Sequence, residues 1–204
     1  MKEHQNSPEQ LPVIILAAGL SSRMGVPKPF LKWDKHITFL EKIAATYSSF
    51  EAGQINIVLN SEGYKYIRNN IPQIAEYSEI IINKHPERGR FSSLKLGLQN
   101  IYANTACYIQ NTDNPFVTEE LLGLMDNLTK PDTYVVPVYK GKGGHPILVG
   151  AEIIKSLLLL DNTDYDLREL LNAYKKTETE TTDMNILVNI NSKEDYHNYF
   201  KHII

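Results

Sequence analysis

The segment from Val13 to Leu31 constrains the fold more than any other part of this sequence. It reads VIILAAGLSSRMGVPKPFL and begins with four apolar residues, three of them β-branched. Such a short, wholly apolar run is typical of a parallel strand that is buried on both faces. The residues after it are small, so backbone N–H groups in this loop can approach a ligand closely. We therefore expect a central strand that ends in a ligand-binding loop.

Two cations in this segment suit a polyphosphate ligand. Arg23 offers a planar fork of donors, and Lys28 offers a point charge on a flexible stem. Their spacing fits neither a Walker A loop nor a dinucleotide-binding glycine fingerprint. On the residues alone, two interpretations stay open. The segment is a phosphate-binding loop, or it is an ordinary strand and turn in which Ser21 or Ser22 caps a short turn.

Composition limits the classes of partner. The chain has 204 residues, 42% of them hydrophobic and 22% charged, with a formal net charge of −3. We expect one domain over residues 12–204 after a disordered tail at 1–11. The net charge predicts no general attraction to nucleic acid or to an anionic membrane. Cys107 lies in an apolar segment and has no partner cysteine in the sequence, which predicts a buried, inert thiol. No signal peptide or bilayer-spanning run is evident, so we expect a cytoplasmic protein.

Alternating strand and helix patterns predict an α/β fold. We expect a Rossmann-like, doubly wound, mostly parallel sheet with helices on both faces and a small β-hairpin insertion. Ligands of such sheets bind at the carboxyl ends of the strands. The predicted strands are 13–16, 54–59, 79–82, 106–110, 133–139 and 185–190, and 145–149 closes a hairpin with 133–139 through the turn at 140–144. The predicted helices are 38–50, 62–70, 118–128 and 151–160, with others beginning near 92, 166 and 191. The Thr and Glu cluster at 177–182 is expected to be a polar connection.

Asp113 follows a predicted strand, at the edge of the sheet where chemistry is expected. A carboxylate there can hold Mg²⁺ and neutralise phosphate charge, or it can form an Asx turn before Pro115. Ser92 and Ser93 likewise have two interpretations, either ligand-binding hydroxyls or the N-cap of the helix that follows.

The string LAAGLSSRMGVPK resembles the signature of the MobA-like NTP transferases, and within them the branch of molybdenum cofactor cytidylyltransferases. The resemblance implies the nucleotide-diphospho-sugar transferase type of fold and a nucleotide site at the end of the first strand. There Arg23 and Lys28 would bind the triphosphate and the leaving pyrophosphate. A second stretch, GRFSSL, is similar to a Gly and Ser-Ser-Leu string in the family, with Phe91 as a departure. The nucleotide-binding residues that the resemblance implies are Leu16, Ala17, Ala18, Gly19, Ser92 and Ser93.

The resemblance also implies a Mg²⁺ cofactor. Asp113 matches the metal-binding Asp of the family, and Asn191 stands at the match to its second acid, so the predicted metal ligands are Asp113 and Asn191. The string Gly144-His145-Pro146 matches the acceptor side of the family's cleft. We expect His145 to bind acceptor phosphate, ahead of a role in proton transfer. Arg168 is expected to be a solvated helix-surface residue, because Asp166 replaces a Gly that relatives carry.

The implied function is transfer of a nucleoside monophosphate to a phosphorylated acceptor such as molybdopterin cofactor, with release of pyrophosphate. CTP is the favoured donor, because guanylyl-transferring relatives tend to carry a second Gly in the turn at Ala17-Ala18-Gly19, whereas the cytidylyl branch tends to carry Ala. The implied protein partner is a molybdoenzyme or a chaperone. Two alternatives stay open: a transferase acting on a sugar phosphate or another small phospho-alcohol, and an inactive nucleotide-binding regulatory module. The second is favoured by Asn189 and Asn191, which replace acids.

Overall fold

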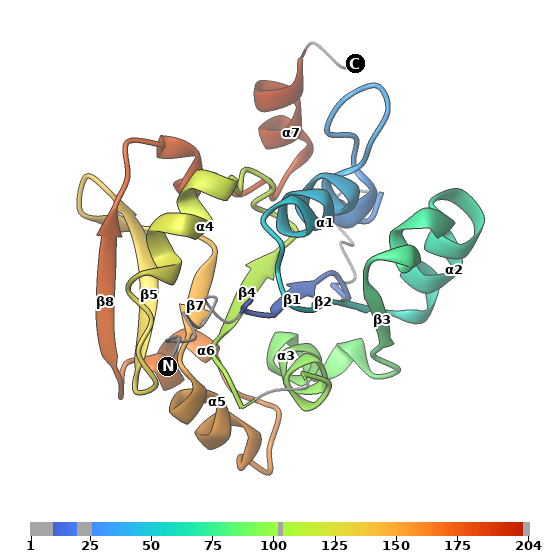
Figure 1. Ribbon diagram of the computed structural model, residues 1–204. Coiled ribbons are helices and arrows are strands. Elements are labelled where there is room, and N and C mark those ends of the chain that lie inside the picture. The colour runs from blue at the N-terminus through green and yellow to red at the C-terminus, as the bar shows by residue number, and fades with distance from the viewer. Residues whose placement is uncertain (1–9, 20–25, 102–103, 202–204) are drawn as a thin grey trace, which may run out of the picture.

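In the computed structural model, residues 10–19, 26–101 and 104–201 are described, and their strands form one eight-stranded mixed sheet (Figure 1). The sheet order is β3-β2-β1-β4-β7-β5-β6, and β8 pairs with β5. Strands β3, β2, β1 and β4 are parallel, whereas β7 runs antiparallel to both β4 and β5. The strands are β1 (Val13–Leu16), β2 (Ile55–Leu59), β3 (Glu79–Ile82), β4 (Cys107–Asn111), β5 (Thr133–Tyr139), β6 (Lys142–Gly143), β7 (Ile147–Val149) and β8 (Lys175–Glu180).

Helices cover both faces of the sheet, which confirms the predicted doubly wound α/β fold (Figure 1). Residues of α1, α2 and α4 pack in the core cluster of one face, and residues of α3, α5 and α6 pack in that of the other. The α-helices are α1 (Phe39–Ser49), α2 (Ser61–Asn70), α3 (Arg90–Gln99), α4 (Glu119–Asp126), α5 (Ala151–Leu158), α6 (Leu167–Leu171) and α7 (Lys193–Phe200). The 3-10 turns are η1 (Lys28–Phe30), η2 (Pro72–Glu76), η3 (Pro86–Arg88) and η4 (Met184–Leu187).

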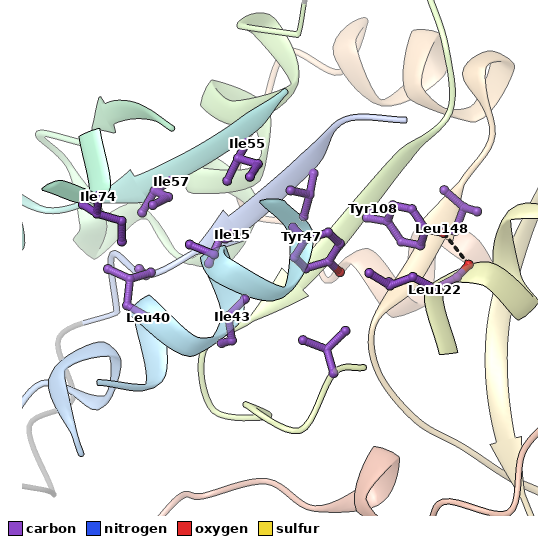
Figure 2. Packing of buried hydrophobic residues seen from close by; sticks show 14 of the residues in the cluster. Ile15, Leu40, Ile43, Tyr47, Ile55, Ile57, Ile74, Tyr108, Leu122 and Leu148 are labelled. Atoms are coloured by element: carbon purple, nitrogen blue, oxygen red, sulfur yellow. Dashed lines mark hydrogen bonds between the residues drawn. The ribbon is translucent and has the colours of Figure 1, made fainter. Parts of the chain in front are cut away.

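Strand β1 lies at the centre of the sheet because both of its faces are apolar. Val13 and Ile15 belong to the core under α1, while Ile14 and Leu16 belong to the core under α3. All four are buried, as the strand pattern predicts. Figure 2 shows Ile15 among the side chains of α1 and the neighbouring strands. Because β1 is held on both faces, the loop at its carboxyl end starts from a rigid position.

Capping residues set the starts of several helices. Thr38 caps α1 in a reciprocal capping box with Glu41, and Thr118 caps α4 through Leu121 N. Both helices therefore begin where the sequence predicts. The predicted hairpin is also present: β5 pairs antiparallel with β6 and β7, and these strands belong to the main sheet. Of the predicted tail, residues 1–9 lie outside the described residues, while Leu11 packs against the core.

Two predictions near the C-terminus are wrong. The segment expected to be a strand at 185–190 instead contains the 3-10 turn η4. The final strand is β8, and it falls on the Thr and Glu cluster that we expected to be a connection. Strand β8 pairs in parallel with β5 at the edge of the sheet, and most of its residues are exposed. A charged edge strand of this kind carries little apolar signal, since charges there discourage pairing with other chains.

An aromatic cluster, Trp33, Phe39, Phe116, Tyr196 and Phe200, attaches helix α7 to the rest of the fold. Trp33 contacts Phe116 and Phe200 edge to face, each with ring centroids 5.5 Å apart. Phe39 of α1 also packs against Phe200, at 5.0 Å. The cluster joins the segments that follow η1 and β4 to α7, and those segments carry the candidate site residues.

Candidate functional site

A cleft of about 270 Å³ lies where β1 and β4 end. This is the edge at which ligands bind in open parallel sheets. The cleft brings together residues from widely separated parts of the chain, as the resemblance implies. Its lining residues are Leu16, Ala17, Ala18, Gly19, Lys28, Pro29, Pro86, Gly89, Arg90, Ser93, Asn111, Thr112, Asp113 and Asn191.

The loop after β1 is tied by hydrogen bonds to β2 and to Asn60, the residue that caps α2. Ala17 N donates to Val58 O at 2.9 Å, and Asn60 Nδ2 donates to Ala18 O at 3.2 Å. Around Gly19, an added Cβ would meet no atom within 4 Å among the described residues, so this part of the loop faces open space. The predicted triphosphate ligand Arg23, with Ser21 and Ser22, lies outside the described residues.

Lys28, Asp113 and Asn191 meet on one wall of the cleft. Lys28 Nζ donates to Asn191 Oδ1 at 2.5 Å and lies 3.9 Å from Asp113 Oδ2. The backbone brings the two oxygen-bearing side chains together, because Ile190 N donates to Asp113 O at 2.7 Å. The Asp195 carboxylate accepts from the backbone N–H groups of Asn191 and Ser192, and these bonds lower its pKa. The arrangement places the Lys28 ammonium beside two side-chain oxygen atoms.

The donor set around Asp113 fits a divalent cation. Only 15% of the Asp113 side chain is exposed. Its Oδ1 atom is buried and accepts no hydrogen bond from any described residue. An orphaned carboxylate oxygen and a nearby amide oxygen are ligands that Mg²⁺ accepts. In this structure the positively charged ammonium of Lys28 lies close to both side chains. Asp113 and Asn191 can therefore hold a metal ion together with phosphate oxygens.

Ser92 and Ser93 lie at the start of α3, but neither of them caps it. Gly89 precedes the helix, and the N-terminal turn has no side-chain cap among the described residues. Both serines are buried inside the first turn, where their hydroxyls accept hydrogen bonds from Asn83. Only Ser93 lines the cleft, because Ser92 faces a separate cavity on the other side of the helix start. The capping interpretation is therefore wrong, and the structure separates the two hydroxyls.

A second, larger cavity of about 700 Å³ adjoins the cleft and shares Leu16, Arg90 and Asn111 with it. Gly144 and His145 line this cavity, on the side where the resemblance implies an acceptor; Pro146, next in the chain, is buried. Three cationic side chains, those of Arg90, Arg168 and Lys176, also line it. The predicted solvated arginine, Arg168, is exposed and at the same time forms part of the cavity wall.

His145 is held in place by its backbone. Gly144 N donates to Pro137 O at 2.8 Å, and His145 N donates to Ile186 O at 3.1 Å. The imidazole Nδ1 is buried and has no hydrogen-bond partner among the described residues. Burial lowers the pKa of His145, while the nearby Asp113 acts in the opposite direction and Arg90 adds to the lowering. A neutral imidazole with an unused nitrogen is suited to hydrogen bonding with a ligand.

Arg90 is a site residue that sequence reasoning missed. Its guanidinium lies 3.9 Å from Asp113 Oδ2, it is 68% exposed, and it lines both the cleft and the second cavity. The signal was the Gly89-Arg90 pair directly before the predicted helix, since the first turn of a helix favours anions. By contrast, the prediction for Cys107 is confirmed: burial raises the pKa of this thiol well above its ordinary value.

A doubly wound sheet with a polar cleft at the ends of β1 and β4, a small-residue loop and a lysine facing a carboxylate defines a nucleotidyltransferase-type Rossmann fold. The family model for the MobA-like NTP transferase domain matches residues 13–178. The chain belongs to this family of nucleotidyltransferases.

Named relatives of this chain are nucleotidyltransferases as well. The molybdenum cofactor cytidylyltransferase of Escherichia coli (strain K12) is 26% identical over 185 residues, which cover 90% of this chain and 92% of the relative. A probable molybdenum cofactor guanylyltransferase of Bacillus licheniformis is 25% identical over 191 residues, covering 89% and 92%. The relatives therefore carry both cytidylyl and guanylyl names.

Solved structures show the same fold. Rv0371c from Mycobacterium tuberculosis H37Rv superposes with a TM-score of 0.82 at 20% identity, covering 96% of this chain and 99% of that one. A nucleotidyl transferase from Methanothermobacter superposes with a TM-score of 0.77 at 19% identity, covering 96% and 98%. Within the described residues, the structure contains no helix long and apolar enough to cross a bilayer.

Proposed function

We propose that the protein transfers CMP from CTP to a phosphorylated small-molecule acceptor such as molybdopterin cofactor and releases pyrophosphate. One observation carries the proposal: a cleft with Lys28, Asp113 and Asn191 on its wall adjoins a larger cavity lined by cationic side chains and His145. Two joined sites, one for a triphosphate and one for a phosphorylated acceptor, are what a nucleotidyl transfer needs.

In this reaction an acceptor phosphate oxygen forms a bond to the α-phosphorus of the nucleotide. The bond from that phosphorus to the bridging oxygen of the leaving pyrophosphate breaks, and the electron pair leaves with the pyrophosphate. The oxygens gain charge in the transition state, so positioning and charge neutralisation supply the rate enhancement. No covalent bond to the protein is required.

Lys28 is placed to follow the charge on the triphosphate. Lys28 lies in η1 and its side chain is 19% exposed at the cleft wall, so its ammonium can move from Asn191 and Asp113 to phosphate oxygens. With the ammonium moved, the oxygens of Asp113 and Asn191 are free to hold Mg²⁺. The bound ion would supply charge neutralisation on the phosphates. The described residues around Asp113 carry two cations against one carboxylate, which favours a highly anionic ligand.

The larger cavity is proposed to take the acceptor. Arg168 and Lys176 lie on its wall away from the cleft, whereas Arg90 lies at its junction with the cleft. This arrangement suits an acceptor whose phosphate lies at the junction beside Arg90 while the rest of the molecule extends toward Arg168 and Lys176. His145 would donate to the acceptor phosphate or accept from it through its unused Nδ1. Arg90, in reach of both ligands, would hold the acceptor phosphate near the α-phosphate.

The preference for CTP rests on the loop after β1. Ala17 and Ala18 are buried, and the Ala18 carbonyl is occupied by Asn60. Relatives that transfer GMP tend to carry a second Gly in this turn, whereas the cytidylyl branch tends to carry Ala. The Ala17-Ala18-Gly19 turn of this chain therefore favours CTP as the donor.

Purified protein incubated with each of the four triphosphates, Mg²⁺ and a panel of acceptors that includes molybdopterin cofactor tests the proposal. We expect pyrophosphate release that needs both CTP and an acceptor. Release with GTP alone among the triphosphates would refute the donor assignment. Turnover with a sugar phosphate but not with the cofactor would instead favour the alternative acceptor. Tight nucleotide binding without any turnover would favour the regulatory module.

A further inference from the structure

The Asn83 side chain, at the end of β3, makes three hydrogen bonds, two of them to the first turn of α3. The side chain is buried, with 2% of it exposed. His85 N donates to Asn83 Oδ1 at 2.8 Å, and Asn83 Nδ2 donates to Ser92 Oγ at 3.1 Å and to Ser93 Oγ at 2.9 Å. One amide thus holds both hydroxyls of the Ser-Ser pair.

The orientation of the Asn83 amide is fixed by its backbone partner. A backbone N–H can only donate, so the atom that it meets must be the amide oxygen. The other terminal atom is therefore the NH₂ group, which can only donate to the two serines. Each serine accepts through an oxygen lone pair and must direct its single proton away from Asn83.

The two protons have different fates. Ser92 Oγ donates to Gly89 O at 2.8 Å, so its proton is used within the protein. Ser93 Oγ has no hydrogen-bond acceptor among the described residues, and Ser93 lines the nucleotide cleft. The Ser93 proton is therefore available to a ligand in the cleft.

We propose that Asn83 is a positioning residue that makes Ser93 a hydrogen-bond donor to an oxygen atom of the bound nucleotide. This inference rests on the proposed nucleotide site. It assigns a role to a residue that does not line the cleft, and it gives Ser92 and Ser93 different roles although both contact the same amide.

The test is a double-mutant cycle read by calorimetric titration with CTP. Ser93→Ala is expected to weaken binding about fivefold, the usual size of one neutral hydrogen bond. Asn83→Asp keeps the acceptor for His85 N but cannot donate, so Ser93 would turn its proton to the new carboxylate. The variant is expected to weaken binding more than Ser93→Ala does, because the added charge also repels phosphate.

The cycle separates the hydroxyl from the charge. In the Ser93→Ala background only the charge effect remains, so Asn83→Asp should weaken binding about fivefold less than it does in wild type. Ser92→Ala is the matched control. In the Ser92→Ala background, the loss of affinity for CTP caused by Asn83→Asp should be the same as in wild type, so that the fold-losses of the two single variants multiply. Equal coupling of Asn83→Asp to both serines, or no coupling to Ser93, would overturn the inference.

Inorganic tripolyphosphate, titrated in parallel, shows which oxygen is bound. If Ser93→Ala binds both ligands more weakly, the acceptor of the Ser93 hydrogen bond is a phosphate oxygen. If it binds only CTP more weakly, the acceptor is an oxygen of the nucleoside. Both results support the inference. If Asn83→Asp does not fold, the affinities of Ser93→Ala and Ser92→Ala for CTP are compared instead. Equal affinities of these two variants overturn the inference. Wild type that binds CTP while Ser93→Ala binds equally well refutes only this inference. Wild type that binds no triphosphate refutes the proposed function as well.

Discussion

Gly144→Ala should destabilise the fold and displace His145. At Gly144 the backbone passes so close to η4 that an added Cβ would lie 2.4 Å from Ile186 O and 2.8 Å from Ile186 C. Ordinary contact begins near 3.4 Å, so the two segments would have to separate by about 1 Å. That movement would stretch the bonds from Gly144 N to Pro137 O and from His145 N to Ile186 O.

The magnitude follows from these contacts. Overpacking costs about 1–3 kcal/mol, and each weakened backbone hydrogen bond adds up to about 1 kcal/mol. We expect a loss of about 3 kcal/mol, which lowers the melting temperature of a domain of this size by about 6–12 °C. Because His145 moves with the backbone, the KM for the acceptor should rise while the Kd for CTP stays near the wild-type value.

Thermal unfolding followed by circular dichroism measures the first effect, and steady-state kinetics well below the melting temperature measures the second. Gly123→Ala is the matched control. This glycine lies inside α4, and an added Cβ meets its nearest neighbour, Phe50 Cε2, at 4.0 Å. That variant should be stabilised by about 0.5–1 kcal/mol through helix propensity. A Gly144→Ala protein that melts within about 2 °C of wild type would show that the close approach does not constrain the backbone.

Other substitutions test the charged groups. Lys28→Ala should leave the melting temperature nearly unchanged and raise the KM for CTP about tenfold or more, since a charge-assisted hydrogen bond to phosphate is lost; unchanged kinetics would contradict this role. Asp113→Asn should abolish turnover, whereas Asn191→Asp should preserve it and strengthen Mg²⁺ binding measured without nucleotide; full magnesium-dependent activity in Asp113→Asn would refute the metal assignment. Burial lowers the pKa of Lys42 to about 8, and the charge of Asp183 acts in the opposite direction. Between pH 8 and about 10.4 the unfolded chain therefore binds more protons, and wild-type stability relative to Lys42→Met should rise with pH. A pH-independent difference in urea denaturation would show that Lys42 titrates normally.

Apolar strands and capped helices were predictable because their signal is local. Strand β3 begins and ends at the predicted residues, and α1 starts after Thr38, where burial and capping agree. Strand β8 was missed because its stability comes from pairing with β5, which the local sequence KKTETE does not encode. The prediction of a strand at 185–190 was wrong because this segment has an apolar pattern but does not pair as a strand. Ile186, Val188 and Ile190 are buried, but the backbone there is held by Asn114, whose Nδ2 donates to three carbonyls of this segment.

The candidate site was predictable as far as its residues follow strands. Lys28 belongs to the LAAGLSSRMGVPK string and Asp113 follows a predicted strand, and the structure brings them together with Asn191. Arg90 lies within the GRFSSL string but was given no role from it, and Asn83 belongs to no quoted motif. Their importance depends on distances across the sheet edge, which place Arg90 near Asp113 and Asn83 against the serines. Those distances follow from the tertiary fold alone.

The contact between Lys28 and Asn191 joins positions 163 residues apart, and α7 holds one side of it through the aromatic cluster. During synthesis, the sheet strands β1 to β4 leave the ribosome long before residue 191 does. The central sheet can therefore form around an incomplete cleft, and the growing chain would hold nucleotide weakly until α7 docks. A C-terminal truncation that removes α7, or a tag that prevents its docking, would leave Asn191 in the chain without the helix that holds it at the cleft. We therefore expect full activity only in chains whose C-terminal helix is intact.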